Sequence, residues 1–372
     1  MNGTDWRLAA SVRTYHQSQV GSPGFEPRVA AIDKEIRSLL TQGEPGLQPF
    51  YGMMLYHLGL DSERSRGGKR LRPLLCSLVF ESLGGDGARV LPVGAAVELL
   101  HNFTLIHDDI EDQDPRRHHR PTVWSVWGVP QAINAGDGMY AISRLAIQRL
   151  RGGGFAPERI LDLSALLDRT CVRVCEGQFL DISFESRTDV TADRYRGMAA
   201  KKTGALFAAS AEGPAILATD DRAVHEQLAL FGAEFGRAFQ AHDDVQGIWA
   251  TSDLTGKVEM NDLVKRKKSL PVVLAFARAS GKTRAELDAL FAPPAPLPAE
   301  NVERIRGILD EQGVRALIER EIAEHRERAL HVLRGVPGVD GGEALDILER
   351  LVRSATGAPD TAAAPAVSAS PS

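Results

Sequence analysis

Apolar residues recur at spacings of three and four along this sequence, from about Val29 to Val352. That is the period of an amphipathic α-helix, and the short alternating runs of β-branched residues that mark strands are nearly absent. Turn clusters such as Gly152-Gly153-Gly154 and Pro293-Pro294-Ala295-Pro296 divide the pattern into about ten segments. The sequence therefore predicts an all-α fold of about ten helices.

The domain organisation is simple. Residues 28–354 contain no internal repeat and no long polar linker, so we expect them to form one domain. Residues 355–372 are rich in Ala, Pro and Ser and offer little to bury, and residues 1–27 are similarly patchy. Both ends are therefore predicted to be disordered.

The composition argues against several classes of partner. With 44 basic and 49 acidic residues the net charge is −5, so the chain has no overall positive field for nucleic acid or anionic lipid. The first residues lack the apolar core of a signal peptide, and no run approaches the roughly 20 apolar residues of a membrane span. We expect a cytoplasmic protein without a transmembrane segment. Cys76, Cys171 and Cys175 have no CxxC partner, which favours packed thiols over redox or zinc chemistry.

A first acidic cluster ends the predicted helix over residues 91–112. Asp108 and Asp112 are four residues apart and so project from one face, with Asp109 beside them. Three carboxylates at the C-terminal end of a helix repel one another and oppose the helix dipole unless a cation neutralises them. Hard oxygen ligands suit Mg²⁺, which commonly uses one or two carboxylates and a substrate phosphate. The cluster therefore predicts a metal-mediated diphosphate site.

A solvated acidic helix end is the alternative interpretation of this cluster. The helix is apolar over much of its circumference, which favours a buried element with a polar end. His101 lies nearly two turns before Asp108 on the same face, and we include it as a site residue, although a core histidine would have the same pattern.

A second acidic cluster lies in the predicted helix over residues 223–249. Gln240 shares a face with Asp243 and Asp244, and the next turn offers Gly247. Two acidic helix ends that face each other across a bundle could hold several Mg²⁺ ions, with a diphosphate bridging the metals.

Two basic segments supply the cations that a diphosphate needs. The first, GGKRLRP at residues 67–73, places Lys69, Arg70 and Arg72 after a glycine turn, at a helix start whose dipole favours anions. A basic run alone is more often a solvated face, but two acidic and two basic clusters on one helical chain favour a diphosphate site. The cations of the second segment are Lys257, Lys265, Arg266, Lys267 and Lys268.

From about residue 30 to 350 the chain resembles the polyprenyl synthetase family, the trans-isoprenyl diphosphate synthases. The motifs GGKRLRP, HNFTLIHDDIED, EGQFLD, KKT, FQAHDDVQGIW, TGK and KKSLP occur in the family's order. The resemblance implies an isoprenoid synthase-type helical bundle around a deep central cavity, usually a homodimer. It also implies Mg²⁺-dependent, head-to-tail condensation of isopentenyl diphosphate with an allylic diphosphate.

The resemblance implies a role for each matching residue. Three Mg²⁺ ions and the allylic diphosphate would be bound by Asp108, Asp109, Asp112, Asp243 and Asp244. The implied isopentenyl diphosphate ligands are Lys69, Arg72 and His101. The implied cations for the allylic diphosphate are Arg117, Lys202, Lys257 and Lys267. The implied polar groups near the reacting carbons are Gln178, Thr203 and Gln240.

The sequence departs from the family pattern at two points. The second acidic motif often reads DDxxD, whereas its last position here is Gly247, which removes one carboxylate. The family often has two arginines where this chain has Arg117-His118, so His118, Arg116 or Arg120 are the candidates for the second isopentenyl diphosphate contact.

Product length would depend on the floor of the cavity. In the family the residues four and five positions before the first aspartate matter, and here these are Thr104 and Phe103. The aromatic residue at this spacing resembles geranylgeranyl diphosphate synthases, with farnesyl diphosphate as the second candidate product. The helical wheel alone places Thr104, not Phe103, nearly beneath Asp108. Less favoured alternatives are a class I terpene cyclase, which has no need of an isopentenyl diphosphate site, and a regulatory subunit, which tends to lose an aspartate motif.

Overall fold

The computed structural model describes residues 24–41, 44–62, 68–118, 120–185, 187, 189–250, 260–292 and 296–358. These residues are predominantly helical, which confirms the predicted all-α fold. Residues 1–23 and 359–372 of the two predicted disordered ends lie outside the described residues.

The described elements follow one another in this order. The first half contains α2 (Glu26–Leu40), α3 (Gln48–His57), α4 (Leu71–Ser82), the 3₁₀ turn η1 (Gly87–Val90), α5 (Leu91–Glu111), the antiparallel strand pair β1 (Arg116–Arg117) and β2 (Arg120–Pro121), α6 (Val123–Trp127), α7 (Val129–Gln148), η2 (Arg149–Gly153) and α8 (Pro157–Glu185). The second half contains α9 (Ala192–Ala199), the π-helical turn η3 (Ala200–Gly204), α10 (Ala205–Ala218), α11 (Arg222–Trp249), α13 (Asn261–Val264), α14 (Leu270–Arg278), α15 (Gly281–Leu290), α16 (Ala299–Glu311), α17 (Val314–Arg334) and α18 (Glu343–Ala355).

Helix α5 is the central element of the larger part of the bundle. It packs against α7, α4, α2 and α10, and buries apolar side chains along most of its length. With the preceding turn, Gly87–Glu111 is long and apolar enough to cross a membrane by length and composition, but 61% of its most apolar window is buried inside the protein. The packing is that of a core helix, and most of its acidic residues gather at its C-terminal end.

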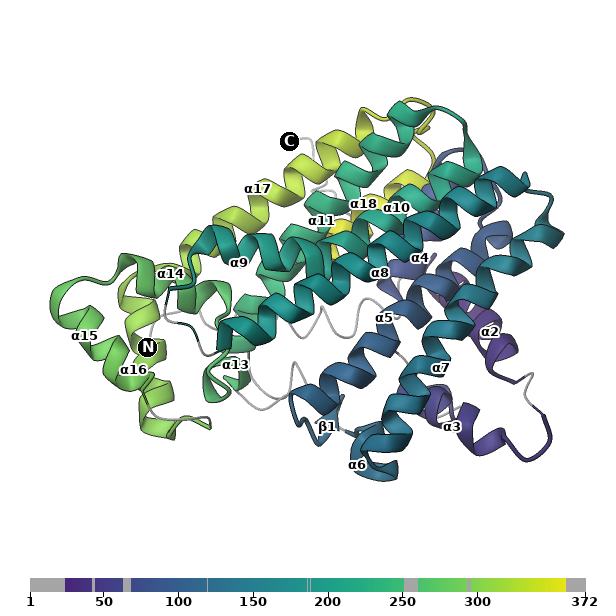
Figure 1. Ribbon diagram of the computed structural model, residues 1–372. Coiled ribbons are helices and arrows are strands. Elements are labelled where there is room, and N and C mark those ends of the chain that lie inside the picture. Colours follow the sequence, from purple (N-terminus) through teal and green to yellow (C-terminus); the bar gives the residue numbers. More distant parts are fainter. Residues whose placement is uncertain are drawn as a thin grey trace, which may run out of the picture.

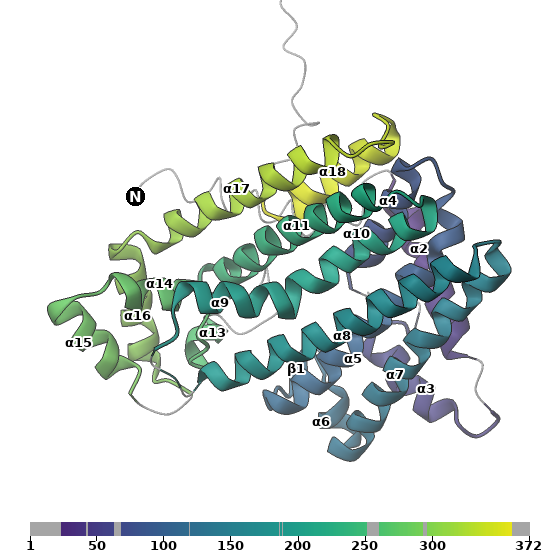
Figure 2. The same ribbon diagram turned by 45° about the horizontal axis from the view of Figure 1, so that its top comes forward.

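A second lobe lies at the far end of the molecule from α2 and α3. Figures 1 and 2 both show α13 to α16 grouped there, with α11 and α17 reaching into the group from the bundle. This lobe has its own core, which includes Leu263, Val273, Leu287, Ile305 and Ile318. Residues 265–268 of the second basic segment join α13 to α14.

Two glycines set the position of η3 between its neighbouring helices. A Cβ at Gly177 of α8 would lie only 2.6 Å from Cα of Lys202, and one at Gly236 of α11 would lie 2.9 Å from Cα of Gly204. Side chains at these positions would separate the backbones, so glycine permits the close approach. The result is that Lys202 is held between α8 and α11.

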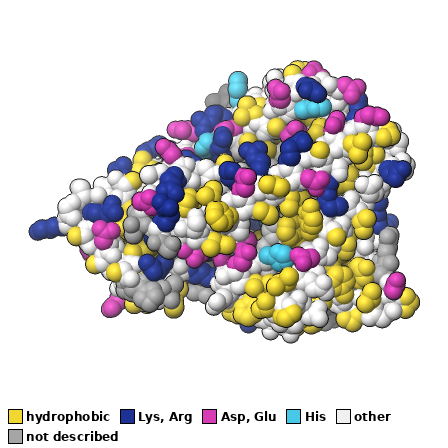
Figure 3. Space-filling model, in the orientation of Figure 1, with side chains coloured by type: hydrophobic (Ala, Val, Ile, Leu, Met, Phe, Trp, Pro, Cys, Tyr) yellow, Lys and Arg dark blue, Asp and Glu magenta, His cyan; other side chains and the backbone are white. Residues whose placement is uncertain are grey.

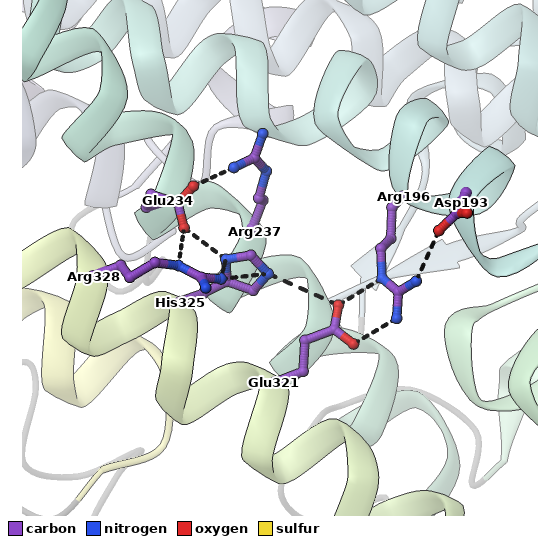
Figure 4. A network of polar contacts seen from close by, with 7 residues as sticks. All are labelled: Asp193, Arg196, Glu234, Arg237, Glu321, His325 and Arg328. Atoms are coloured by element: carbon purple, nitrogen blue, oxygen red, sulfur yellow. Dashed lines mark hydrogen bonds and ion pairs between the residues drawn. The ribbon is translucent and has the colours of Figure 1, made fainter.

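A polar network joins α17 to α11 and α9 (Figure 4). Glu234 of α11 is buried, and its carboxylate contacts His325 Nδ1 at 2.7 Å and accepts from Arg328 Nε at 3.1 Å. Glu321 of α17 forms a bidentate pair with Arg196 of α9, at 2.8 Å for each contact. These charge-assisted contacts tie α11, the carrier of the second acidic motif, to the helices on either side.

Candidate active site

The three carboxylates at the end of α5 each face a cation from a different part of the chain. Arg117 comes from β1, Lys202 from η3 and Lys267 from the segment before α14. The contacts are Asp108 to Lys202 at 4.0 Å, Asp109 to Arg117 at 2.8 Å and Asp112 to Lys267 at 2.8 Å. The structure thus brings the first acidic cluster and three of the predicted allylic cations together.

The burial of these carboxylates is incompletely compensated. Burial raises the pKa of Asp108 even though Lys202 and Arg117 oppose it, and burial likewise raises the pKa of Asp109 to about 6. Burial would also raise the pKa of Asp112, but Lys267, Lys265 and Lys202 together outweigh it and the net pKa is lowered. The α5 end is therefore short of positive charge at Asp108 and Asp109.

The donor set fits a hard divalent cation. Oδ2 of Asp109 is buried without a hydrogen-bond partner in the described part of the chain, and Asp108 has only the long contact to Lys202. Among the described residues, no group of three Asp, Glu, His or Cys side chains is already arranged as a metal site. The carboxylates are turned toward lysine and arginine instead. Oxygen ligands that are buried and undercompensated suit Mg²⁺.

The second acidic cluster lies at the end of α11 and is asymmetric. Asp243 is exposed, whereas Asp244 is buried and accepts from Tyr195 Oη at 2.6 Å, Gln240 Nε2 at 2.9 Å and the Leu270 amide at 3.3 Å. Burial raises the pKa of Asp244 to about 8 despite the bonds from Tyr195 and Gln240. Asp244 therefore binds a proton near neutral pH in the absence of a cation.

Gly247, at the last position of the second motif, lies beside a carboxylate from another helix. A Cβ at Gly247 would overlap the carboxylate of Asp262, with 2.8 Å to its Cγ. Asp262 lies on α13, and its negative charge acts together with burial to raise the pKa of Asp244. Its negative charge thus lies next to the last position of the second motif, although it is supplied by a different segment.

The predicted polar groups lie on the same side of the bundle. Thr203 donates to Gln240 Oε1 at 2.6 Å, which links η3 to α11. Lys202 Nζ donates to Asp181 at 2.6 Å. Gln178 of α8 donates to Glu111 of α5 at 2.6 Å, and its Oε1 is buried without a partner in the described residues.

Arg72 is a half-buried cation without a carboxylate partner among the described residues. No described acid lies within 4.0 Å of it, its Nε has no hydrogen-bond partner, and its guanidinium lies 4.6 Å from the centroid of the Phe207 ring. Burial lowers its pKa to about 10, with Glu98 and Asp243 opposing. Burial, then Arg72 and other cations, lowers the pKa of His101 well below its usual value. Arg72 and a neutral His101 therefore lie close together, and we call this side of the site the cationic wall.

Lys69 lies on the same wall. Its side chain keeps accessible surface, yet burial of the ammonium by the surrounding protein lowers its pKa to about 8, against the charge of Asp243. The start of α4 thus faces the acidic end of α11.

Arg70 corrects one prediction. Its side chain is buried, and its three nitrogens donate to Asp33 at 2.7 Å, Glu98 at 3.0 Å and the Leu58 carbonyl at 2.8 Å. Its donors are directed to the protein, so it braces α2, α3 and α5 and is not placed to bind substrate. The sequence could not show this, because Asp33 and Glu98 are distant along the chain.

The β1–β2 turn carries the candidates for the second contact to isopentenyl diphosphate. His118 is exposed at this turn with a left-handed φ of 49°. Arg120 forms a bidentate pair with Asp61 at 3.0 and 2.8 Å and lies over the ring of Tyr56, which commits it to a structural role. His118 and Arg116 therefore stay as the candidates.

The two predicted floor residues lie on different sides of α5. Phe103 is buried against α7, with ring centroids 5.3 Å apart from Tyr140 and 5.8 Å from His107. Thr104 is only partly buried, and its hydroxyl donates to the carbonyl of His101 at 2.7 Å. Lys257, the remaining predicted cation, lies outside the described residues.

Sequence reasoning missed four groups in this region. Asp181 could have been found, since it is three residues after Gln178 in EGQFLD and so shares its helical face. His57, whose pKa burial and Arg117 lower to about 3, Tyr195 and Asp262 belong to separate segments and carried no local signal.

Comparisons with known proteins show the family of this chain. The family model described as polyprenyl synthetase matches residues 59–309. Geranylgeranyl diphosphate synthase of Mycobacterium tuberculosis is 40% identical over 293 residues, covering 77% of this chain and 82% of the relative. (2E,6E)-farnesyl diphosphate synthase of Mycobacterium bovis is 40% identical over 258 residues, covering 68% and 70%. The crystal structure of geranylgeranyl pyrophosphate synthetase from Pyrococcus horikoshii has a TM-score of 0.79 at 30% identity, covering 95% of this chain and 98% of that one.

Replacing one carboxylate of α5 should stabilise the protein without metal. Because the folded-state pKa of Asp108 is raised, the wild type loses stability as pH rises above the usual value of 3.8, and Asp108→Asn does not. We expect Asp108→Asn to unfold at a higher temperature than wild type at pH 8 in EDTA, with the difference shrinking toward pH 4.

The control is Asp162→Asn, which makes the same change at an exposed carboxylate of α8. It should have little effect on stability at either pH. Lower stability of Asp108→Asn at pH 8 would show that Asp108 stabilises the fold and contradict the undercompensated site.

Proposed function

Because the chain belongs to the polyprenyl synthetase family, it is a prenyltransferase, and we propose that its active site lies between the acidic ends of α5 and α11. The reaction is the head-to-tail condensation of isopentenyl diphosphate with an allylic diphosphate. Residues 28–354 act as one catalytic domain in this proposal. Two diphosphates must be bound side by side, so the site needs two anion subsites of different chemistry.

The unpaired Arg72 is the observation that carries the isopentenyl diphosphate subsite. A half-buried guanidinium whose Nε is buried without a partner is costly, and a bound anion removes that cost. Lys69 and His101 lie on the same wall, and His101 is neutral, so it can donate one hydrogen bond without adding charge. His118 or Arg116 of the β1–β2 turn supplies the further contact.

The acidic helix ends carry the allylic subsite. Asp108, Asp109, Asp112, Asp243 and Asp244 would hold three Mg²⁺ ions, which would supply positive charge to the diphosphate leaving group. Asp262 contributes negative charge where Gly247 has none. With metal bound to the acids, the lysines and arginine that pair with these carboxylates would be available to the diphosphate. These cations are Arg117, Lys202 and Lys267, with Lys257 in the same role outside the described residues.

The chemical step is a substitution at carbon. The allylic C–O bond breaks, the double bond of isopentenyl diphosphate supplies the electron pair of the new C–C bond, and a proton leaves to restore a double bond. That proton goes to the released diphosphate. Lys202 and Lys267 stabilise charge on the leaving group, while Thr203, Gln240 and Gln178 orient the reacting ends. The apolar wall of α5 excludes water, which would otherwise capture the allylic cation.

Product length is the finer part of the proposal. We favour geranylgeranyl diphosphate, because buried Phe103 closes the packing between α5 and α7 below the acidic end. Farnesyl diphosphate stays the alternative, since relatives with either product in their names have the same identity to this chain. A terpene cyclase would not need the cations Lys69 and Arg72 around the start of α4, and a regulatory subunit would not need the two acidic clusters. These features favour a synthase over either alternative.

We also propose that the enzyme is a cytoplasmic homodimer. Figure 3, drawn in the orientation of Figure 1, shows apolar side chains gathered over the region of α7 and α8. Exposed fractions there are 61% for Leu145, 69% for Leu161, 59% for Val172 and 71% for Phe179. Large apolar side chains this exposed on neighbouring helices suit burial against a second copy.

The reaction itself can be tested directly. With Mg²⁺, isopentenyl diphosphate and geranyl or farnesyl diphosphate, the wild type should give longer prenyl diphosphates, identified by mass after dephosphorylation.

Loss of Arg72 should selectively weaken the binding of isopentenyl diphosphate. Arg72→Ala should raise the KM for isopentenyl diphosphate by about tenfold or more, since a charge-assisted contact is lost. The control Arg222→Ala removes an exposed arginine and should leave both KM values unchanged. A selective rise in the KM for the allylic substrate would show that the two subsites are exchanged.

Truncating Phe103 should lengthen the product. Phe103→Ala leaves a cavity that the growing chain can occupy, so longer products should appear on chromatography of the dephosphorylated mixture. The matched control is Phe80→Ala, which removes another buried aromatic ring and should cost about 3 to 5 kcal/mol with an unchanged product. If Phe103→Ala only destabilises the enzyme, Thr104 or a facing helix sets the length.

A charge on the α8 face should separate the dimer. Val172→Arg places a cation in the proposed interface, and sedimentation velocity should show the monomer where wild type sediments as a dimer. Leu230→Arg makes the same change at an apolar side chain of α11 that is 47% exposed, and should leave the dimer intact. A monomeric wild type, or dissociation by both variants alike, would reject this interface.

A further inference from the structure

The second lobe contains a cavity on the far side of the basic segment from the active site. It has a volume of about 280 Å³ and lies between α14, the end of α15, the segment that follows α8, and residues 266–268. Figure 1 places α14 and α15 in this lobe, away from the acidic end of α5. None of the residues that line the cavity belongs to the active site described above.

The cavity wall carries uncompensated positive charge. Arg266 and Lys268 both line it, and no described carboxylate lies within 4.0 Å of either side chain's nitrogens. Nε of Arg266 is buried without a hydrogen-bond partner in the described residues. The one acid of the wall, Asp288, is paired with Arg284 at 3.1 Å. Two cations therefore face the cavity without a counterion.

Lys268 is held in place by aromatic rings rather than by an acid. Its Nζ lies 5.0 Å from the ring centroid of Phe291 and 5.7 Å from that of Phe276. Burial, followed by the like charge of Arg266, lowers the pKa of Lys268. An anion next to these two cations would remove both costs.

Apart from Arg187 and Asp288, which form ion pairs with Asp189 and Arg284, the rest of the cavity lining is apolar. Val272 and Val273 of α14 are 1% and 2% exposed, and Phe276 and Phe291 complete the lining around the cations. Free phosphate would use the cations but leave these apolar walls facing water. A ligand that satisfies both parts has an anionic head and a short apolar chain, and the volume suits a small ligand.

We propose that this cavity is a second, metal-independent ligand site that binds a phosphate or diphosphate ester with a short apolar chain. The site shares the chemistry of prenyl diphosphates but is built from cations and aromatic rings instead of carboxylates. Its existence does not depend on the proposed catalytic function, since binding needs neither Mg²⁺ nor turnover.

The site is connected to the active site through one residue. Lys267 lies between Arg266 and Lys268 in the chain, and its ammonium contacts Asp112 at 2.8 Å. Its amide also donates to the carbonyl of Asp262 at 2.8 Å. Neighbouring residues of one short segment thus line both sites, so a ligand in the cavity restrains the segment that positions Lys267.

Calorimetric titration in EDTA tests the site. The probe is geranyl diphosphate, and the background variant is Arg72→Ala, which disables the proposed isopentenyl diphosphate subsite. The charge-reversal variant adds Lys268→Glu, and its matched control adds Lys282→Glu, the same change at an exposed residue of α15 outside the cavity. A third variant, Ala292→Trp, blocks the exposed rim of the cavity with little demand on folding.

We expect geranyl diphosphate to bind the background and the Lys282→Glu variant alike, and at least tenfold more weakly to the Lys268→Glu and Ala292→Trp variants. Inorganic diphosphate should bind at least tenfold more weakly than geranyl diphosphate, because it leaves the apolar wall uncovered. Equal binding of the two probes, equal binding by all variants, or no binding to the background would each overturn the proposal. Activity of the wild type with Mg²⁺ is measured separately, so failure of this site leaves the catalytic proposal untouched.

Discussion

The electrostatic cost of the carboxylates gathered at two helix ends governs the rest of this structure. Asp109 on α5 and Asp244 on α11 are buried and Asp108 is half-buried, and all three have raised pKa values, so the protein's own cations do not fully compensate them. A fold keeps such an arrangement only if something from outside completes it. A divalent metal would supply the missing positive charge, and the same charge would support catalysis by stabilising the diphosphate leaving group.

The bundle serves to hold the opposing cations within reach of these acids. Lys202 is delivered by a π-helical turn that fits between α8 and α11 only because Gly177 and Gly236 have no side chain. Lys267 comes from the segment between α13 and α14 of the second lobe, and it reaches Asp112 at the end of α5. The cations thus belong to elements whose positions are set by packing, while the acids belong to long helices with apolar cores. Charge balance at the site is therefore a property of the whole fold.

Much of this could be predicted from the sequence, because helical period and local spacing are local properties. Asp108 and Asp112 share a face by spacing alone, and both acidic clusters could be located in this way. The roles of Arg70 and Asp262 could not, since each depends on partners from distant segments. Arg70 looked equivalent to Arg72 in the sequence, yet Arg70 is bonded to Asp33 and Glu98, whereas Arg72 has no acid partner among the described residues. Tertiary partners decide which cation is left for the substrate.

The central claim is that metal and diphosphate bind together because each alone leaves charge uncompensated. Calorimetric titration of the wild type with Mg²⁺, in the absence and presence of inorganic diphosphate, tests this most directly. The account predicts weak Mg²⁺ binding alone and binding at least tenfold tighter with diphosphate present, with the difference lost in Asp108→Asn. Equal Mg²⁺ affinity with and without diphosphate would contradict it.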